Sequence, residues 1–146
     1  MMNPSRLYRE QQILEKFFPG CCTFINGDDG DYLDIWVKSN SASHYCLRIM
    51  LDMFPERAPE MFLVHPKMLA DNYGVELISL GANCAAKLLE PSKGFLQLAY
   101  NNAAVWSQDL TLYEVTLKGI TWVNAYEGYR RSGIPIHHMI SDQIFY

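Results

Sequence analysis

Prolines within residues 53–66 constrain the fold more than any other feature of this sequence. The stretch reads MFPERAPEMFLVHP and contains Pro55, Pro59 and Pro66. Proline fixes its own φ and pushes the residue before it into extended conformations. The first two prolines therefore predict a stiff, non-helical crossover. The apolar run that follows, residues 60–64, predicts a short buried strand that stops at Pro66.

Length and composition predict one folded domain that covers residues 1–146. Hydrophobic residues make up 49% of the chain and charged residues 19%, as in a compact globular protein. A net charge of −4 argues against a nucleic-acid binder that works by phosphate neutralisation. The sequence shows no run of eighteen apolar residues and no signal-type start. We therefore expect a cytoplasmic protein that binds neither nucleic acid nor membranes.

Before the crossover, the sequence predicts a helix and then strands. Asn3 and Pro4 are typical of a helix start, and Pro19 and Gly20 of a helix end, so we expect a helix over residues 4–18. The apolar period then changes from 3.6 to 2, which predicts an antiparallel meander. Its four predicted strands cover residues 21–26, 32–38, 44–54 and 60–64.

After the crossover, a segment of roughly 27 residues between Pro66 and Gly94 shows no strand alternation. We expect a short helix over 71–80 and a turn over 83–89. A long helix should follow over 111–132, because Thr111 and Glu114 have the spacing of a capping box. Its predicted apolar stripe consists of Leu112, Val115, Gly119, Trp122 and Tyr126. The complete layout is that of an α+β fold.

The cysteines and histidines predict no metal centre, and no cofactor motif is present. Cys21 and Cys22 would point to opposite faces of a strand, so we interpret them, like Cys46, as reduced packing residues. The neighbours His137 and His138 would diverge in the same way. The acidic turn over 27–31 lacks the spaced ligands of a calcium loop.

This order of elements resembles the ubiquitin-conjugating enzyme fold and its relatives, the catalytically inactive variants and the RWD domains. The resemblance covers nearly the whole chain. It rests on the proline pairs in 54–59, on His65 with Pro66, on GFLQL at 94–98 and on WSQDLTL at 106–112. The ending, residues 122–129 with Gly133 and His137, is more similar to bacterial members encoded with antiphage conjugation systems.

The resemblance implies a reaction that moves the C-terminus of a ubiquitin-like protein from an activating enzyme onto a cysteine and then onto a nucleophile. The position that matches the family's cysteine is Gln97, which cannot form a thioester, and Lys67 stands where the family has asparagine. Cys84, beside Asn83, is the one cysteine outside the predicted strands. It is either a replacement thiol or a small buried residue.

Two further positions complete the candidate site. His65 is either a general base or a histidine that hydrogen-bonds to the backbone. Trp106, with Gln97, is implied by the resemblance to lie on a partner-binding surface. Two hypotheses follow. In the first, the protein is a conjugating enzyme whose thiol has moved to Cys84. In the second, it is a non-catalytic member that binds a ubiquitin-like protein, an activating enzyme or a partner conjugating enzyme through its sheet and first helix. A third is an RWD-type scaffold without a link to conjugation.

Overall fold

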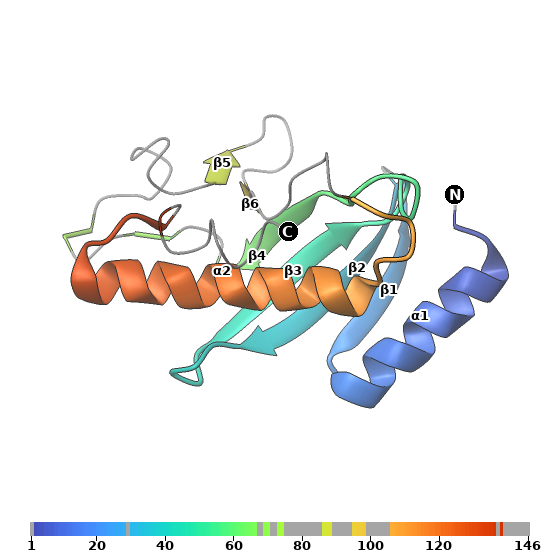
Figure 1. Ribbon diagram of the computed structural model, residues 1–146, viewed down its shortest axis with the longest axis horizontal. Coiled ribbons are helices and arrows are strands. Elements are labelled where there is room, and N and C mark those ends of the chain that lie inside the picture. Colours follow the sequence, from blue (N-terminus) through green and yellow to red (C-terminus); the bar gives the residue numbers. More distant parts are fainter. Residues whose placement is uncertain are drawn as a thin grey trace.

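A helix, an antiparallel sheet and a second, longer helix follow one another in the computed structural model of the chain (Figure 1). The structure describes residues 2–28, 30–66, 69–70, 73–74, 86–88, 95–98, 106–136 and 138. The predicted α+β layout is confirmed for this part of the chain. Cys84, Asn83 and His137 lie outside it, as does most of the helix predicted over 71–80.

The first helix, α1, spans Pro4–Phe17, close to the predicted 4–18. Its start is fixed by Asn3, whose side chain accepts a hydrogen bond from the Arg6 amide at 2.8 Å. Proline fits the first helical position because it has no N–H to leave unpaired there. The chain turns away at Gly20, which has a φ of +72° that glycine adopts without strain.

The sheet begins with the predicted meander. Strands β1 (Cys22–Gly27), β2 (Gly30–Lys38), β3 (His44–Met50) and β4 (Met61–His65) pair in sequence, and every pair is antiparallel. Two further strands, β5 (Ala86–Leu88) and β6 (Leu96–Leu98), extend the sheet in the order β1-β2-β3-β4-β6-β5.

The expected count of four strands was therefore too low for the described residues, and the turn predicted over 83–89 was wrong for 86–88. Three residues are too few to show a period of two, so β5 and β6 leave no pattern to detect.

Strand β3 is shorter than predicted and ends at Met50 instead of residue 54. Beyond it, the Leu51 amide still donates to the Asp31 carbonyl at 2.9 Å, and a turn follows. Leu51 is buried as the alternation predicted, but the Met53 side chain is 51% exposed. The turn that leads into the proline crossover overrides the period-two pattern at that position.

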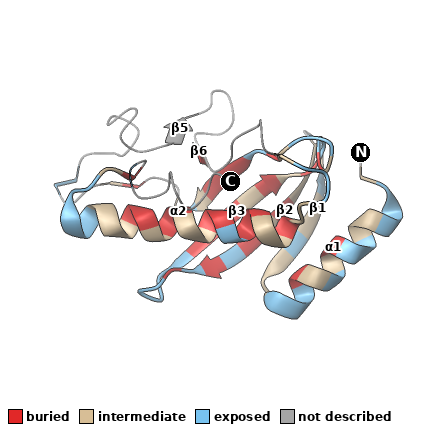
Figure 2. Ribbon diagram, in the orientation of Figure 1, coloured by how far each residue is buried: buried red, intermediate tan, exposed pale blue. Residues whose placement is uncertain are grey.

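The long helix, α2, spans Leu112–Ser132 and crosses one face of the sheet (Figure 1). The predicted capping box is present, and Gly133 ends the helix in the left-handed region with a φ of +78°. Every residue of the predicted apolar stripe is buried. Figure 2 shows the buried residues of α2 and of the strands behind it, which together form the core.

Gly119 lets this helix approach the sheet closely. A Cβ atom added at Gly119 would lie 2.5 Å from Leu47 Cδ1 and 2.8 Å from Met61 Sδ. Within the described residues, neither helix combines the length and the apolar character needed to span a membrane.

Candidate functional site

The proline crossover and the tryptophan before α2 meet, although they are about fifty residues apart in sequence. The Trp106 indole N–H donates a hydrogen bond to the Pro55 carbonyl at 2.9 Å. The ring of Trp106 also lies edge-on to Phe54, with 6.1 Å between the centroids, and Phe54 is fully buried. The Phe54–Pro55 and His65–Pro66 peptide bonds are cis. Two of the motifs that carry the family resemblance thus form one contact.

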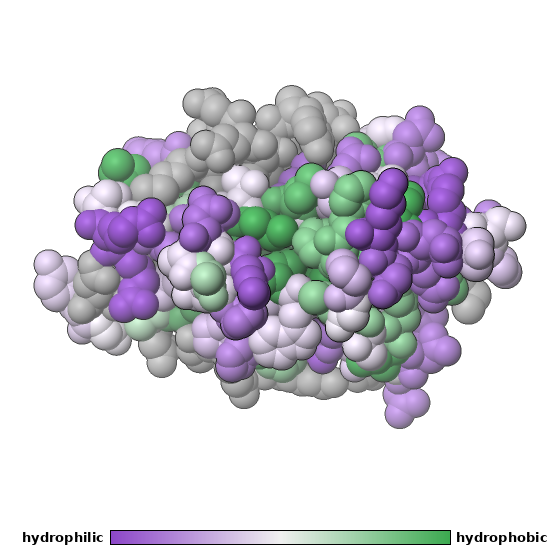
Figure 3. Space-filling model, turned by 90° about the horizontal axis from the view of Figure 1, so that it is seen from below, coloured by the Kyte–Doolittle hydropathy of each residue, from purple (hydrophilic) through white to green (hydrophobic). Residues whose placement is uncertain are grey.

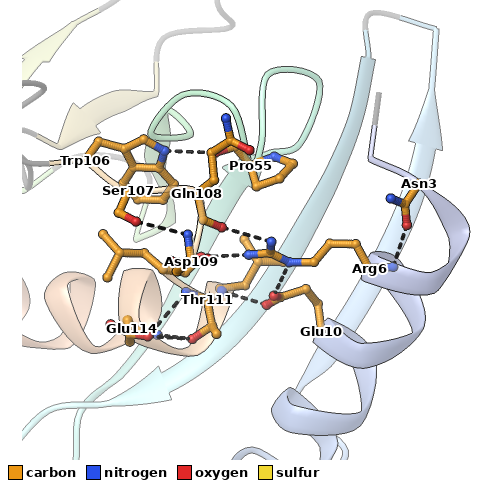
Figure 4. A network of polar contacts seen from close by, with 12 residues as sticks. Asn3, Arg6, Glu10, Pro55, Trp106, Ser107, Gln108, Asp109, Thr111 and Glu114 are labelled. Atoms are coloured by element: carbon orange, nitrogen blue, oxygen red, sulfur yellow. Dashed lines mark hydrogen bonds and ion pairs between the residues drawn. The ribbon is translucent and has the colours of Figure 1, made fainter.

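Helix α1 fixes the segment between Trp106 and α2 (Figure 4). Arg6 donates from Nη1 to the Gln108 carbonyl and from Nη2 to the Leu110 carbonyl, each at 2.9 Å. Its Nε pairs with Glu10 Oε2 at 2.8 Å, and the other Glu10 oxygen accepts from the Leu112 amide, also at 2.8 Å. This set of contacts, which we call the α1 clamp, connects the first helix to the N-terminus of α2.

The α1 clamp places a carboxylate where α2 needs an acceptor. The first amides of a helix have no partner within the helix, and the helix dipole is positive at that end. The Glu10 side chain is fully buried, so its charge is compensated by Arg6 and by the Leu112 amide instead of by water. The clamp was not predicted from the sequence. The spacing of Arg6 and Glu10, four residues apart on a helix, was the signal that marks such a pair.

Gln97 lies on β6 and pairs across the sheet with Phe62 of β4 and Lys87 of β5. Its side-chain Nε2 donates to Glu60 Oε2 at 3.0 Å, so the crossover contacts Trp106 near one end and Gln97 near the other. The Gln97 Oε1 atom is buried, and none of the described residues donates a hydrogen bond to it. The amide at this position is thus fixed in the sheet through one end only.

His65 lies at the end of β4, opposite Cys46 of β3, with an exposed side chain. The contact that the structure records for its ring is with Trp36, at 5.3 Å between the centroids. The imidazole therefore lies against an aromatic side chain at the sheet surface, with the two ring planes tilted by 47°. The two predicted roles of His65, general base and backbone hydrogen-bonding residue, both stay predictions.

Cys22 and Cys46 are unsuited to nucleophilic chemistry, whereas Cys21 precedes β1 instead of lying on it as predicted. Burial raises the pKa of Cys22 to about 11, with further contributions from Cys21 and Glu15. Burial likewise raises the pKa of Cys46 to about 11, and the nearby Asp34 adds to it. Since the thiolate is the nucleophile, both residues are almost fully protonated at neutral pH. Cys46 is buried and Cys22 packs against the core, as expected of packing residues.

A second polar cluster attaches the hairpin between β2 and β3 to α2. Glu127 accepts hydrogen bonds from Ser39 Oγ at 2.8 Å, Ser41 Oγ at 2.9 Å and Tyr45 Oη at 2.8 Å. Partial burial opposes ionisation of Glu127, but the hydrogen bonds from Tyr45 and the serines outweigh it and lower the pKa of the carboxyl. A polar pocket of about 480 Å³ lies beside this cluster, lined by Asn40, Asn124 and Arg131 among others.

Arg48 on the opposite face of the sheet forms a bidentate pair with Asp34, at 2.8 and 2.9 Å. Its guanidinium carbon lies 4.1 Å from the centre of the Tyr32 ring. Neither this pair nor the Glu127 cluster was predicted, because their members are distant in sequence.

Comparisons with protein-family models, with curated proteins and with solved structures return no match to the chain. A functional assignment therefore depends on the residues and the contacts described above.

Proposed function

We propose that this protein has a ubiquitin-conjugating enzyme-like fold and acts in a ubiquitin-like protein conjugation pathway, where it carries or binds the ubiquitin-like protein. The observation that carries the proposal is the contact between Trp106 and the crossover at Phe54 and Pro55. These two motifs gave the resemblance independently of each other. Their meeting, within a helix, meander and helix of matching order, is what a shared architecture requires.

The first form of the proposal is a conjugating enzyme that uses Cys84. A thioester forms when a thiolate attacks the activated C-terminal carbonyl of the ubiquitin-like protein and displaces the leaving group of the activating enzyme. Gln97 has no sulfur, and the pKa values of Cys22 and Cys46 are too high for this step. We assign carriage to Cys84, the one cysteine outside the strands predicted from the sequence, with Asn83 as an oxyanion donor and His65 as a base.

The second form is a non-catalytic member that binds partner proteins without thioester chemistry. Gln97 favours it, because the position that holds the nucleophile in active relatives is occupied here by an amide hydrogen-bonded to Glu60. In this form Gln97 and Trp106 belong to a surface that recognises the ubiquitin-like protein, its activating enzyme or a partner conjugating enzyme. An RWD-type scaffold is the version of this form without a link to conjugation. The similarity of residues 122–129 to bacterial antiphage members suggests a role in antiviral defence.

An adduct assay separates the two forms. The protein is incubated with ATP, a ubiquitin-like protein and its activating enzyme, taken from genes adjacent to its own, and its intact mass is measured with and without thiol reductant. The first form predicts an adduct that thiol reductant removes. Cys84→Ala should abolish the adduct, and Cys84→Ser should replace it with an ester that resists reductant. Cys21→Ala should leave the adduct unchanged. Absence of an adduct, with an activating enzyme shown to be charged, rules out the first form.

A further inference from the structure

Strand β1 is an edge of the sheet with unpaired backbone groups. Its partner in the sheet is β2, and the Trp36 amide donates to the Cys21 carbonyl at 3.0 Å. In an antiparallel pair, hydrogen-bonded and non-hydrogen-bonded positions alternate, so residues 23 and 25 also bond to β2. The Asp31 carbonyl, opposite Asn26, accepts from Leu51 on the far side, which confirms this alternation. The residues that direct N–H and C=O outward are therefore Cys22, Phe24 and Asn26.

Helix α1 does not pair with this edge. It packs against α2, and in Figure 1 its C-terminal end lies beside the start of β1 while the rest of the helix diverges from the strand. None of the described residues donates to or accepts from the outward groups of β1. The strand also has no buried residue, unlike β2, β3, β4 and β6. As far as the described residues are concerned, its outward groups are thus left to water or to another strand.

The sequence of β1 lacks the features that normally prevent edge association. Natural edge strands carry charged residues, proline or a bulge that discourages pairing with another chain. The strand here reads CTFING, with neither charge nor proline, and its register with β2 is continuous over all six residues. It also contains Thr23, Phe24 and Ile25, which favour extended conformations. An uncharged, continuous edge of this kind is suited to pairing with another strand.

We propose that β1 pairs with β1 of a second copy of this chain, in an antiparallel arrangement centred on Phe24. The two sheets then form one continuous sheet about a twofold axis, as an isologous interface requires. Each outward residue meets an outward residue of the other copy, Phe24 with Phe24 and Cys22 with Asn26, which gives about six hydrogen bonds. The two Phe24 rings form a cross-strand aromatic pair, and each Thr23 lies opposite Ile25 of the other copy.

The charges at the two ends of β1 favour an antiparallel copy as the occupant. Near the start of β1 lie Lys16, in the last turn of α1, and Lys38 of β2, together with Glu15. Near its end lie Asp28 in the turn and Asp31 of β2. Antiparallel pairing places the start of each strand beside the end of the other, so the end of the sheet that carries the lysines in one copy adjoins the end that carries the aspartates in the other.

An apolar surface adjoins the start of the strand. Cys22 Sγ contacts the Phe18 carbonyl at 3.9 Å, and the neighbouring Phe17 ring lies 4.4 Å from Tyr113 with 49% of the Phe17 side chain exposed. Figure 3 shows that apolar side chains gather in the middle of the face below α2, surrounded by hydrophilic ones. A second copy that extends the sheet at β1 lies next to the exposed Phe17 side chain, which adds a hydrophobic contribution to the hydrogen bonds.

Sedimentation velocity of the full chain, over a concentration series that reaches about 100 µM, tests the proposal. We expect the mass to rise from 16.8 kDa to twice that value.

Asn26→Pro removes an outward N–H without removing a β1–β2 bond and should raise the dimer Kd at least about tenfold. Asn26→Ala keeps the N–H and is the matched control, with an unchanged Kd. Thr23→Lys, at an exposed side chain, should weaken the dimer without touching the backbone.

Hydrogen exchange identifies the surface. The amides of Cys22, Phe24 and Asn26 should become protected as the concentration rises, while those of Thr23 and Ile25 are protected throughout. A protein that stays at 16.8 kDa over the whole series overturns the proposal. So does a dimer that leaves the three outward amides unprotected, or one in which Asn26→Pro and Thr23→Lys dimerise as tightly as Asn26→Ala.

Discussion

The α1 clamp should contribute more to stability than its position at the edge of the fold suggests. Glu10 is fully buried and accepts from both Arg6 Nε and the Leu112 amide. Replacing Glu10 with alanine leaves the Leu112 amide without its acceptor and Arg6 without its counter-charge. We therefore expect Glu10→Ala to lower the free energy of unfolding.

The magnitude follows from the partners that remain. Removing one member of a buried ion pair costs about 3–5 kcal/mol. Arg6 keeps its bonds to the Gln108 and Leu110 carbonyls and is 13% exposed, so the cost should lie near the lower end, about 3 kcal/mol. For a chain of this length that corresponds to a fall in Tm of about 6–12 °C. Glu10→Gln keeps an acceptor for Leu112 and loses only the charge, so it should cost about 1–2 kcal/mol.

Urea unfolding followed by circular dichroism measures these values, with Glu15→Ala as the matched control. Glu15 lies on the same helix and is exposed, and its one recorded contact is a 3.2 Å bond from the Gly20 amide. The two alanine substitutions change helix propensity equally, so their difference reports the buried contacts. Glu15→Ala should change the free energy of unfolding by less than about 0.5 kcal/mol. Equal effects of Glu10→Ala and Glu15→Ala would refute the reasoning.

Three further predictions concern the core, the thiols and the hairpin. Gly119→Ala should lower the free energy of unfolding by about 1–3 kcal/mol in the same urea assay, because the added methyl group overlaps Leu47. In a double-mutant cycle, Gly119→Ala should lower that free energy by less when Leu47→Ala is also present. Cys22 and Cys46 should react with iodoacetamide at pH 7 far more slowly in the folded than in the urea-unfolded protein, because their pKa values are about 11; equal rates would contradict this. The pKa of Glu127 is lower in the folded than in the unfolded state. The carboxylate therefore contributes its full stabilisation above the unfolded-state pKa and loses it as the pH falls through the folded-state pKa. In Glu127→Gln, the free energy of unfolding should depend less steeply on pH in that acid range.

The elements with strong local signals were predictable from the sequence. The capping box at Thr111 and the glycine at 133 gave α2 its two ends, and the apolar stripe gave the face that packs on the sheet. The period of two predicted a strand over 32–38, and β2 spans Gly30–Lys38 with Leu33 and Ile35 fully buried. In these cases local propensity and burial favour the same structure, so a short pattern is sufficient.

The remaining features depend on contacts between distant residues. β5 and β6 are too short for a periodic pattern; β6 owes its place to pairing with β4, and β5 pairs with β6. Met53 is exposed because a turn interrupts the strand pattern before it. The bond from Trp106 to Pro55 was equally hidden, although each motif was recognised separately. Cys84 and Asn83, on which the catalytic hypothesis depends, lie outside the described residues and stay predictions.

The claim that this chain acts in a ubiquitin-like protein pathway is tested most directly by a binding titration. The ¹⁵N-labelled protein is titrated with the ubiquitin-like protein and, separately, with the activating enzyme from adjacent genes, and amide chemical shifts are recorded. Both forms of the proposed function predict saturable shifts for at least one partner, among residues of the sheet, of α1 or around Gln97 and Trp106. Spectra that neither partner changes, together with the absence of an adduct, would contradict the claim and leave a scaffold unconnected to conjugation.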